Sequence, residues 1–237
     1  MLAFSFRVAI AGAILAFMPL LTAAAVDAPR PANAEQARID QAVQAYASKL
    51  EADQEKARDQ LILNNATALL RDPGSPVLGN REGDVAVIEF FDYTCPYCKA
   101  VEPRLEKLLK DDKRVKLVVK EFPILTPESL IATKAALASV KQGKYEQFHQ
   151  ALMLFKGRLQ TDVIFDTAKD VGLDVDRLHK DMNAPEITDE IIANFNLARS
   201  LRIFQTPAFI VGNHMLTGLS AEIDFPKTVA AARAKSR

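Results

Sequence analysis

Two cysteines are the residues of this chain best suited to chemistry, and they stand in the order Cys95-Pro96-Tyr97-Cys98. The apolar run over residues 85–91 predicts a buried strand before them, and a helix follows. Unpaired amides at a helix N-terminus stabilise a thiolate, which is the species that attacks disulfides. We therefore expect Cys95 to be the nucleophile at the exposed helix end and Cys98, one turn deeper, to be the resolving thiol. Pro96 suits a helix start, where its missing N–H costs nothing.

Half of a metal site is the main alternative for such a pair of cysteines. A closed zinc site needs four ligands, and the histidines that could complete it are His149, His179 and His214, which are not spaced as a ligand pair. A copper(I) ion held by two thiolates stays an alternative, because soft thiolates suit that ion. We expect no cofactor and no resident metal.

The first residues predict export. Arg7 is the sole charge before Asp27, an apolar run follows over residues 8–21, and three alanines end at Ala25. This order is typical of a secretory signal peptide over residues 1–25, and it places the protein in the periplasm. An uncleaved anchor is the alternative, but the run is short for a spanning helix, which needs about 20 residues. The two cysteines then meet an oxidising compartment with no third thiol, which favours a reactive pair.

Charge and composition exclude some partners. The chain has 237 residues, with 30 basic and 30 acidic side chains, and 49% of its residues are hydrophobic. A net charge of zero gives no indication of nucleic acid as a partner, and the composition is that of an ordinary globular protein.

The segment before the catalytic region predicts a long helix. Residues 26–33 read as a linker, and residues 34–70 contain neither glycine nor proline. A seam of apolar side chains with coiled-coil spacing runs along this helix; it comprises Ile39, Val43, Tyr46 and Leu50. This pattern favours a helix that joins copies of the chain into a homo-oligomer. A helix that lies against the body of its own chain is the alternative.

The remaining elements predict an α/β fold in residues 71–237. Residues 71–83 are rich in turn formers and mark a boundary, and a second strand is expected at 115–119. Helices are expected at 101–110, 128–141, 144–156, 161–171, 175–183, 187–202 and 221–234, and a hairpin at 208–211 and 214–217. One mixed sheet flanked by helices, with a helical block inserted in it, is the simplest packing.

Four segments together resemble the DsbA-like branch of the thioredoxin superfamily, including its ScsC and DsbG groups. They are Glu89–Lys99 around the cysteines, Pro76–Asn80, Lys120–Pro123 and Gln205–Phe209. The resemblance covers roughly residues 72–235. It implies a thioredoxin fold with an inserted helical domain at about residues 125–203, preceded here by the N-terminal helical extension.

The resemblance also implies roles for further residues. Thr206-Pro207 matches the family's cis-proline pair, which faces the cysteines and pairs with an extended substrate. Pro96 and Tyr97 match the variable dipeptide beside the substrate that tunes the redox potential. Glu89, six residues before the first cysteine, matches a buried acid that could take the proton of the resolving thiol.

The alternative for Glu89 is a carboxylate paired with a lysine such as Lys120. Asp92 and Lys99 read as solvated charges at the rim of the site, and His214 reads as a packed or surface histidine.

These observations predict a periplasmic thiol–disulfide oxidoreductase whose clients are proteins with cysteines, and whose redox state depends on a membrane partner. The N-terminal helix favours an oligomeric isomerase or reductase, because facing sites can hold a misfolded client. A monomeric oxidase that donates disulfides is the alternative within the same chemistry. A periplasmic protein that binds copper(I) or clients is the alternative of another class.

Overall fold

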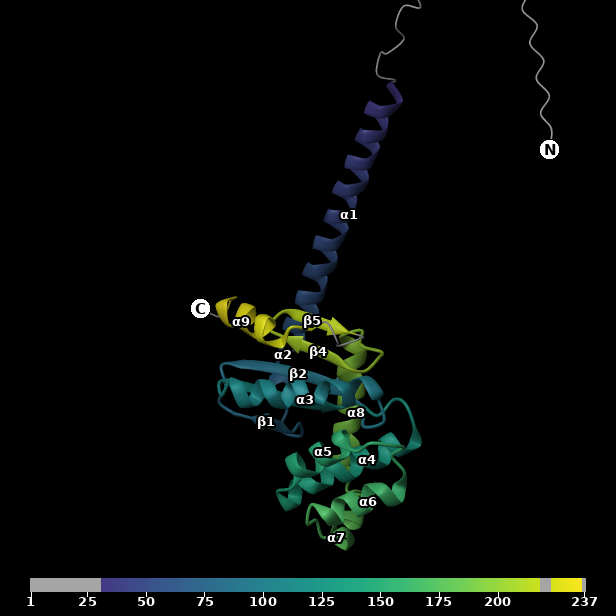
Figure 1. Cartoon of the computed structure of the whole chain (residues 1–237), viewed down its shortest axis with the longest axis vertical. Coiled ribbons are helices and arrows are strands. Elements are labelled where there is room, and N and C mark those ends of the chain that lie inside the picture. Colours follow the sequence, from purple (N-terminus) through teal and green to yellow (C-terminus); the bar gives the residue numbers. More distant parts are fainter. Residues whose placement is uncertain (1–30, 218–222, 236–237) are drawn as a thin grey trace, which may run out of the picture. The chain divides into compact units, whose positions relative to one another are not determined.

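The computed structural model describes residues 31–217 and 223–235 (Figure 1). The chain divides into two compact units, one ending at Ser48 and the other beginning at Lys49. The expected signal peptide at residues 1–25 lies outside the described residues.

Helix α1 runs over Pro31–Asn64, so residues 31–33, which we expected in the linker, belong to the helix. The expected helix at 34–70 is broken at Asn65, whose side-chain amide donates to the carbonyl of Leu61 (2.8 Å), and α2 (Ala66–Leu70) follows. In the second unit, Ile62 and Leu69 are buried in the core, whereas the seam residues Ile39 to Leu50 are 46–70% exposed. A deletion up to Arg71 would therefore remove part of the core of that unit.

In the part of the chain that the structure describes, five strands form one mixed sheet in the order β1-β3-β2-β4-β5. The strands are β1 (Val77–Gly79), β2 (Val85–Phe91), β3 (Val115–Glu121), β4 (Ala208–Val211) and β5 (His214–Thr217). Strands β2 and β3 are parallel, and every other pair is antiparallel. The predicted α/β fold is confirmed. Strand β1, which we read as part of a turn-rich boundary, is a short edge strand.

The helices follow the predicted order. Their bounds are α3 (Pro96–Asp111), α4 (Pro127–Ser139), α5 (Tyr145–Leu154), α6 (Thr161–Asp170), α7 (Val175–Asp181), α8 (Pro185–Ser200) and α9 (Phe225–Lys235), with a short 3-10 turn at Val140–Gln142. Helices α4 to α8 form the insertion between β3 and β4. Figure 1 shows α4 to α7, in teal to green, gathered beyond the β1 side of the sheet.

The sheet has a separate hydrophobic cluster on each face, because successive side chains of a strand point to opposite faces. Val87 and Phe91 belong to the cluster that includes residues of α3, α9 and the insertion. Ile88 and Phe90 belong to the cluster that includes Ile62 of α1 and residues of α2 and α8. The same alternation places Glu89 on the α3 face and therefore beneath the cysteines.

Lys120 lies on the opposite face, so the alternative that pairs it with Glu89 is wrong. In register, Lys120 is opposite Phe90, and Glu89 is opposite Val119. The Lys120 ammonium is fully buried and donates to the carboxylate of Asp72 (2.8 Å) and to the hydroxyl of Ser75. Burial alone would raise the pKa of Asp72, but the bond and charge of Lys120 outweigh it and hold that pKa below its usual value.

Candidate active site

Strand β2 and helix α3 place the cysteines at the edge where the parallel strands end. Cys95 is the N-cap of α3, and its backbone N–H donates to the Asp92 carbonyl (3.0 Å), which closes the turn between strand and helix. Pro96 opens the helix, as expected. The turn thus directs the Cys95 sulfur toward the free N–H groups of the first helical turn.

The Cys95 sulfur lies among hydrogen-bonding groups. The backbone N–H of Cys98 donates to it (3.4 Å), and the Cys95 thiol lies 3.4 Å from the Thr206 carbonyl oxygen. A hydrogen bond from the Cys98 thiol, aided by the Thr206 hydroxyl and by backbone N–H groups, outweighs burial and lowers the pKa of Cys95 to about 6. Cys95 is therefore largely a thiolate at neutral pH, which suits a nucleophile.

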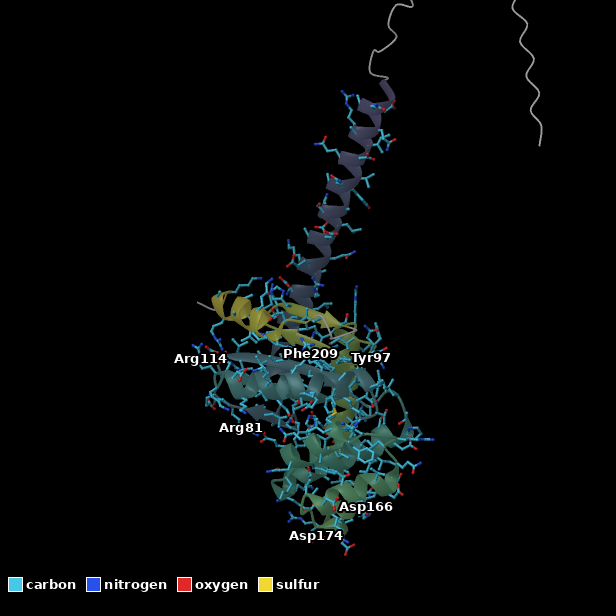
Figure 2. All side chains as sticks on the ribbon, in the orientation of Figure 1. Arg81, Tyr97, Arg114, Asp166, Asp174 and Phe209 are labelled. Carbon is cyan, nitrogen blue, oxygen red and sulfur yellow. The ribbon has the colours of Figure 1, made fainter. Side chains whose placement is uncertain are left out.

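Cys95 is only 2% exposed, so the expectation that its side chain lies at an exposed helix end is wrong. Thr206 explains the difference: the loop that carries it covers the sulfur, and the Thr206–Pro207 peptide bond is cis. Tyr97, two residues after Cys95, is by contrast 51% exposed and is labelled in Figure 2.

Cys98 and Glu89 are both fully buried on the α3 face of the sheet. Burial raises the pKa of Cys98 well above its usual value, and the neighbouring Cys95 and Glu89 act in the same direction. Burial likewise raises the pKa of Glu89, with Glu102, Cys95 and Glu121 adding to the effect. Neither carboxyl oxygen of Glu89 has a hydrogen-bond partner within the described residues. Two buried acids with raised pKa values therefore lie close enough to influence each other.

Asp92 is fully buried, so our expectation of a solvated rim charge is wrong. One carboxylate oxygen accepts from the backbone N–H and hydroxyl of Thr94 and from the hydroxyl of Ser129, at 2.7–2.9 Å. The other accepts from the backbone N–H groups of Ile124 and Leu125, at 2.9 and 3.0 Å. Asp92 thus joins the end of β2, the loop after β3 and the start of α4 directly beneath the active-site turn.

The expectation that Lys99 is a solvated charge at the rim of the site is also wrong. Its ammonium donates to the carbonyls of Leu152, Met153 and Phe155 at the C-terminal end of α5, and burial lowers its pKa to about 8. Lys99 therefore fastens the active-site helix to the insertion. A cavity of about 370 Å³ lies beside it, lined by Thr94, Pro96, Lys99, Leu125, Thr126, Glu128, Gly157, Arg158 and Leu159.

A buried polar cluster behind the cysteines has no counterpart in our sequence predictions. Glu121 of β3 accepts hydrogen bonds from the hydroxyls of Tyr93 (3.0 Å), Thr133 (2.8 Å) and Tyr145 (2.8 Å). Burial raises the pKa of Glu121 to about 7, although the charge of His149 and these hydroxyls oppose it. In β3 the odd-numbered residues face α3, so the alternation of side chains could have placed Glu121 on that face. Nothing in the sequence, however, pairs Glu121 with residues of the insertion.

His214 is partly exposed on β5. His179 is exposed on α7 with its ring 4.0 Å from that of Phe165, and His149 is buried. Over residues 31–217 and 223–235 there is no group of three or more histidine, cysteine or acidic side chains placed to hold a metal ion.

In the same part of the chain, no helix is both long and apolar enough to span a membrane.

Comparisons with known proteins agree with this geometry. A model of the DSBA-like thioredoxin domain matches residues 86–228. A thioredoxin-like oxidoreductase from Silicibacter pomeroyi is 43% identical and superimposes with a TM-score of 0.69, over 71% of this chain and 97% of that one. The catalytic domain of Proteus mirabilis ScsC is 28% identical, with a TM-score of 0.66, over 74% of this chain and 98% of that domain.

Two curated relatives are longer than this chain. A putative protein-disulfide oxidoreductase of Rickettsia felis is 28% identical over 168 residues, which are 65% of this chain and 60% of that protein. Na(+)/H(+) antiporter NhaA 1 of Salinispora arenicola is 29% identical over 155 residues, which are 62% of this chain and 24% of the antiporter. The chain thus spans about a quarter of one relative's length and less than two thirds of the other's.

Asp92→Asn is expected to lower the free energy of unfolding by about 2–3 kcal/mol, because an amide nitrogen cannot accept the hydrogen bonds that one carboxylate oxygen receives. Urea unfolding measures this change. The matched control is Asp111→Asn, whose carboxylate forms an exposed pair with Lys107, and it should stay within about 0.5 kcal/mol of the parent chain. An equally small effect at Asp92 would show that the buried carboxylate does not hold the turn.

Alkylation of the reduced protein by iodoacetamide is expected to accelerate with a midpoint near the Cys95 pKa of about 6. The pKa is depressed, so the thiolate and its stabilisation are present above that pH and are lost as the pH falls through it. Thr206→Val removes the hydroxyl and should move the midpoint upward, whereas Thr206→Ser should leave it in place. A midpoint at about 8.5, which is the pKa of a free cysteine, would contradict the assignment of Cys95 as nucleophile.

Proposed function

The chain belongs to the family of DSBA-like thioredoxin domains, and we propose that it works as an exported isomerase or reductase of disulfides in client proteins. Thiol–disulfide oxidoreduction is the chemistry of the family, and the stabilised Cys95 sulfur beside the cis Thr206–Pro207 bond is the observation that carries the proposal. The clients are proteins with cysteines in the periplasm. Residues 1–25 direct the export.

Exchange begins when the Cys95 thiolate attacks a client disulfide. The client S–S bond breaks, a mixed disulfide forms, and one client sulfur leaves as a thiolate. In isomerisation, a second client thiol attacks the mixed disulfide and releases Cys95 unchanged. In reduction, Cys98 attacks the Cys95 sulfur, the client leaves reduced, and the resulting Cys95–Cys98 disulfide is reduced again by a membrane partner.

Glu89 takes the proton that Cys98 must lose before it attacks. A carboxyl group in water is far more acidic than a thiol, so it is a poor base for one. Burial raises the pKa of Glu89 and brings it closer to that of the thiol, which lowers the cost of the transfer. The carboxyl group is free for this role because both its oxygens lack partners among the described residues.

The client contacts two segments, one beside Cys95 and one around the cis peptide bond. Pro96 and Tyr97 form the exposed surface next to Cys95, and the backbone at Thr206 and Pro207 pairs with an extended client segment as an added strand would. Phe204, which is exposed just before this loop, extends the apolar surface for a client that is not fully folded. Such contacts suit a range of sequences, because main-chain pairing does not read side chains.

A homo-oligomer forms through residues 34–70. The apolar seam of α1 is exposed along its length, whereas Ile62 and Leu69 further along this segment are buried in the core. Seams of this spacing pack between helices of separate copies. Facing active sites would then hold one client between them at high effective concentration.

An oxidase that donates its disulfide is the second candidate, and the Cys95 pKa of about 6 favours it. A stabilised thiolate favours the reduced protein over its disulfide, so the disulfide form is the more oxidising. The two candidates share every active-site step and differ in the direction of exchange and in the need for an oligomer.

Glu89→Gln is expected to slow the release of client from the mixed disulfide by about 100-fold, because Cys98 loses its base. Rapid mixing of the reduced protein with a disulfide-bonded peptide measures this step, and the first attack by Cys95 should proceed within about threefold of the parent rate. Cys98→Ser is the reference variant and should accumulate the mixed disulfide without resolving it. Resolution at the parent rate in Glu89→Gln would remove Glu89 from the mechanism.

Scrambled ribonuclease tests the isomerase proposal. The chain without residues 1–25 should restore ribonuclease activity, and the pair Val43→Glu with Tyr46→Glu should be monomeric in sedimentation and about tenfold slower or worse. Gln41→Glu with Ser48→Glu places the same charges on the opposite face of α1 and should behave as the parent chain. These substitutions leave the buried Ile62 and Leu69 in place.

Three results would count against the isomerase. A parent chain that is monomeric, or seam variants that isomerise at full rate as monomers, would show that α1 does not form the shared site. A chain that fails to reactivate scrambled ribonuclease but rapidly oxidises the reduced enzyme would be the oxidase of the second candidate.

A further inference from the structure

His149 of α5 is fully buried in the polar cluster behind the cysteines. Its Nδ1 lies 3.0 Å from the Tyr93 hydroxyl oxygen, and Tyr93 donates its own proton to Glu121 (3.0 Å). A hydroxyl has a single proton to donate, so Nδ1–H of His149 must be the donor to Tyr93. The second ring nitrogen, Nε2, is therefore the atom at which this imidazole gains or loses a proton.

Nε2 of His149 faces the active-site helix. It lies 3.7 Å from Oε1 of Glu102, which stands on α3 four residues after Cys98. Residues four apart share one face of a helix, so the carboxylate and the resolving thiol point to the same side of α3. The second oxygen of Glu102, Nε2 of His149 and both oxygens of Glu89 have no hydrogen-bond partner among the described residues.

Unpaired polar atoms at this depth are costly unless they carry a function or share a proton. Here they occur on three titratable residues that adjoin one another and the cysteine pair. The electrostatic influence of Glu102 on Glu89, and of Glu89 on Cys98, connects them in that order. The imidazole is held in place by the rings around it, at 5.0 Å from Phe91 and stacked at 5.5 Å on Tyr145.

Acidic groups surround His149. The titratable and charged groups that face it or adjoin it are Glu89 of β2, Tyr93 after it, Lys99, Glu102 and Glu106 of α3, Glu121 of β3 and Tyr145 of its own helix. Lys99 is the cation among them, and its ammonium is turned to the carbonyls at the end of α5. A proton on Nε2 is thus the positive charge best placed to balance new negative charge in this pocket.

We propose that His149 is a positioning residue of the redox pair, which takes up a proton at Nε2 opposite Glu102 when the Cys95–Cys98 disulfide is reduced. Reduction by a thiol buffer adds two electrons and breaks the S–S bond, one proton goes to the Cys98 sulfur, and the Cys95 sulfur keeps a negative charge. The imidazolium–Glu102 pair balances that charge across the site. The inference rests on the exchange chemistry of the proposed function and holds for an isomerase, a reductase or an oxidase.

Linkage makes the effect reciprocal. If reduction favours the imidazolium, then protonation of the imidazole favours the reduced cysteines by the same factor. The pH at which His149 is half protonated should therefore be higher in the reduced protein than in the oxidised one. A shift of about one pH unit corresponds to about a tenfold change in the thiol–disulfide equilibrium.

Nuclear magnetic resonance can follow His149 directly, because the chain has three histidines. Titration of the oxidised and the reduced protein, with the imidazole nitrogens labelled, should show a shift of about one pH unit for His149 and none for His179, which is exposed on α7. The nitrogen shifts should also identify Nε2 as the atom that titrates. Equal midpoints for His149 in the two redox states would overturn the proposal without any variant having to fold.

Equilibrium with glutathione between pH 5 and 8 gives the second measurement. In the parent chain, protonation of His149 should contribute about a tenfold change in the equilibrium constant over this pH range. His149→Gln should abolish that contribution, and His179→Gln should leave it unchanged. An identical pH dependence in His149→Gln would assign the imidazole a structural role alone. This assay does not involve isomerisation, so a chain that fails with scrambled ribonuclease can still pass it, and a functioning isomerase can still fail it.

Discussion

A hydrogen bond from the Cys98 thiol to the Cys95 sulfur, in a site nearly closed to water, gives the two cysteines opposite acidities. Sharing the proton favours the anion on Cys95 and penalises one on Cys98. The first turn of α3 adds backbone N–H donors around Cys95, because that residue caps the helix. The difference in acidity between the two thiols is therefore a consequence of where each sulfur lies along one helical turn.

Burial raises the pKa of Cys98, and a carboxyl group is buried in the same pocket. Strand alternation places it there, since Glu89 shares the face of Val87 and Phe91 and lies under α3. A carboxyl group exposed to water would hold its proton too weakly to exchange it with a thiol. The burial that makes an ionised Glu89 costly for the fold is the same property that raises its pKa toward that of a thiol.

Buried charges elsewhere hold the frame around this pocket. Asp92 gathers backbone N–H groups from the loop after β3, Lys99 caps the carbonyl end of α5, and Lys120 joins β3 to Asp72 on the far face. Each charge is satisfied by groups from another segment, so each would be costly if that segment moved. The insertion is thereby fixed to the thioredoxin part beside the active-site turn.

Much of the fold and part of the site follow from local patterns. The run Val85–Phe91 and the helix-opening Cys95-Pro96 locate the reactive pair, since a strand followed by a capped helix depends on neighbouring residues alone. Periodicity also predicted the insertion and the hairpin, because each helix or strand carries its own apolar pattern. The three-residue β1 was missed, since so short an edge strand forms only against β3.

Tertiary structure alone decided which charges are buried and what they contact. Asp92, Lys99 and Lys120 read as ordinary polar residues in sequence, and their distant partners lie 32 to 56 positions away along the chain. Tyr93, Glu121 and His149 meet behind the cysteines because the insertion folds back against β3. Local sequence determines which groups can do chemistry, whereas the acidity of each group depends on solvent exclusion and on distant partners, which exist only in the folded chain.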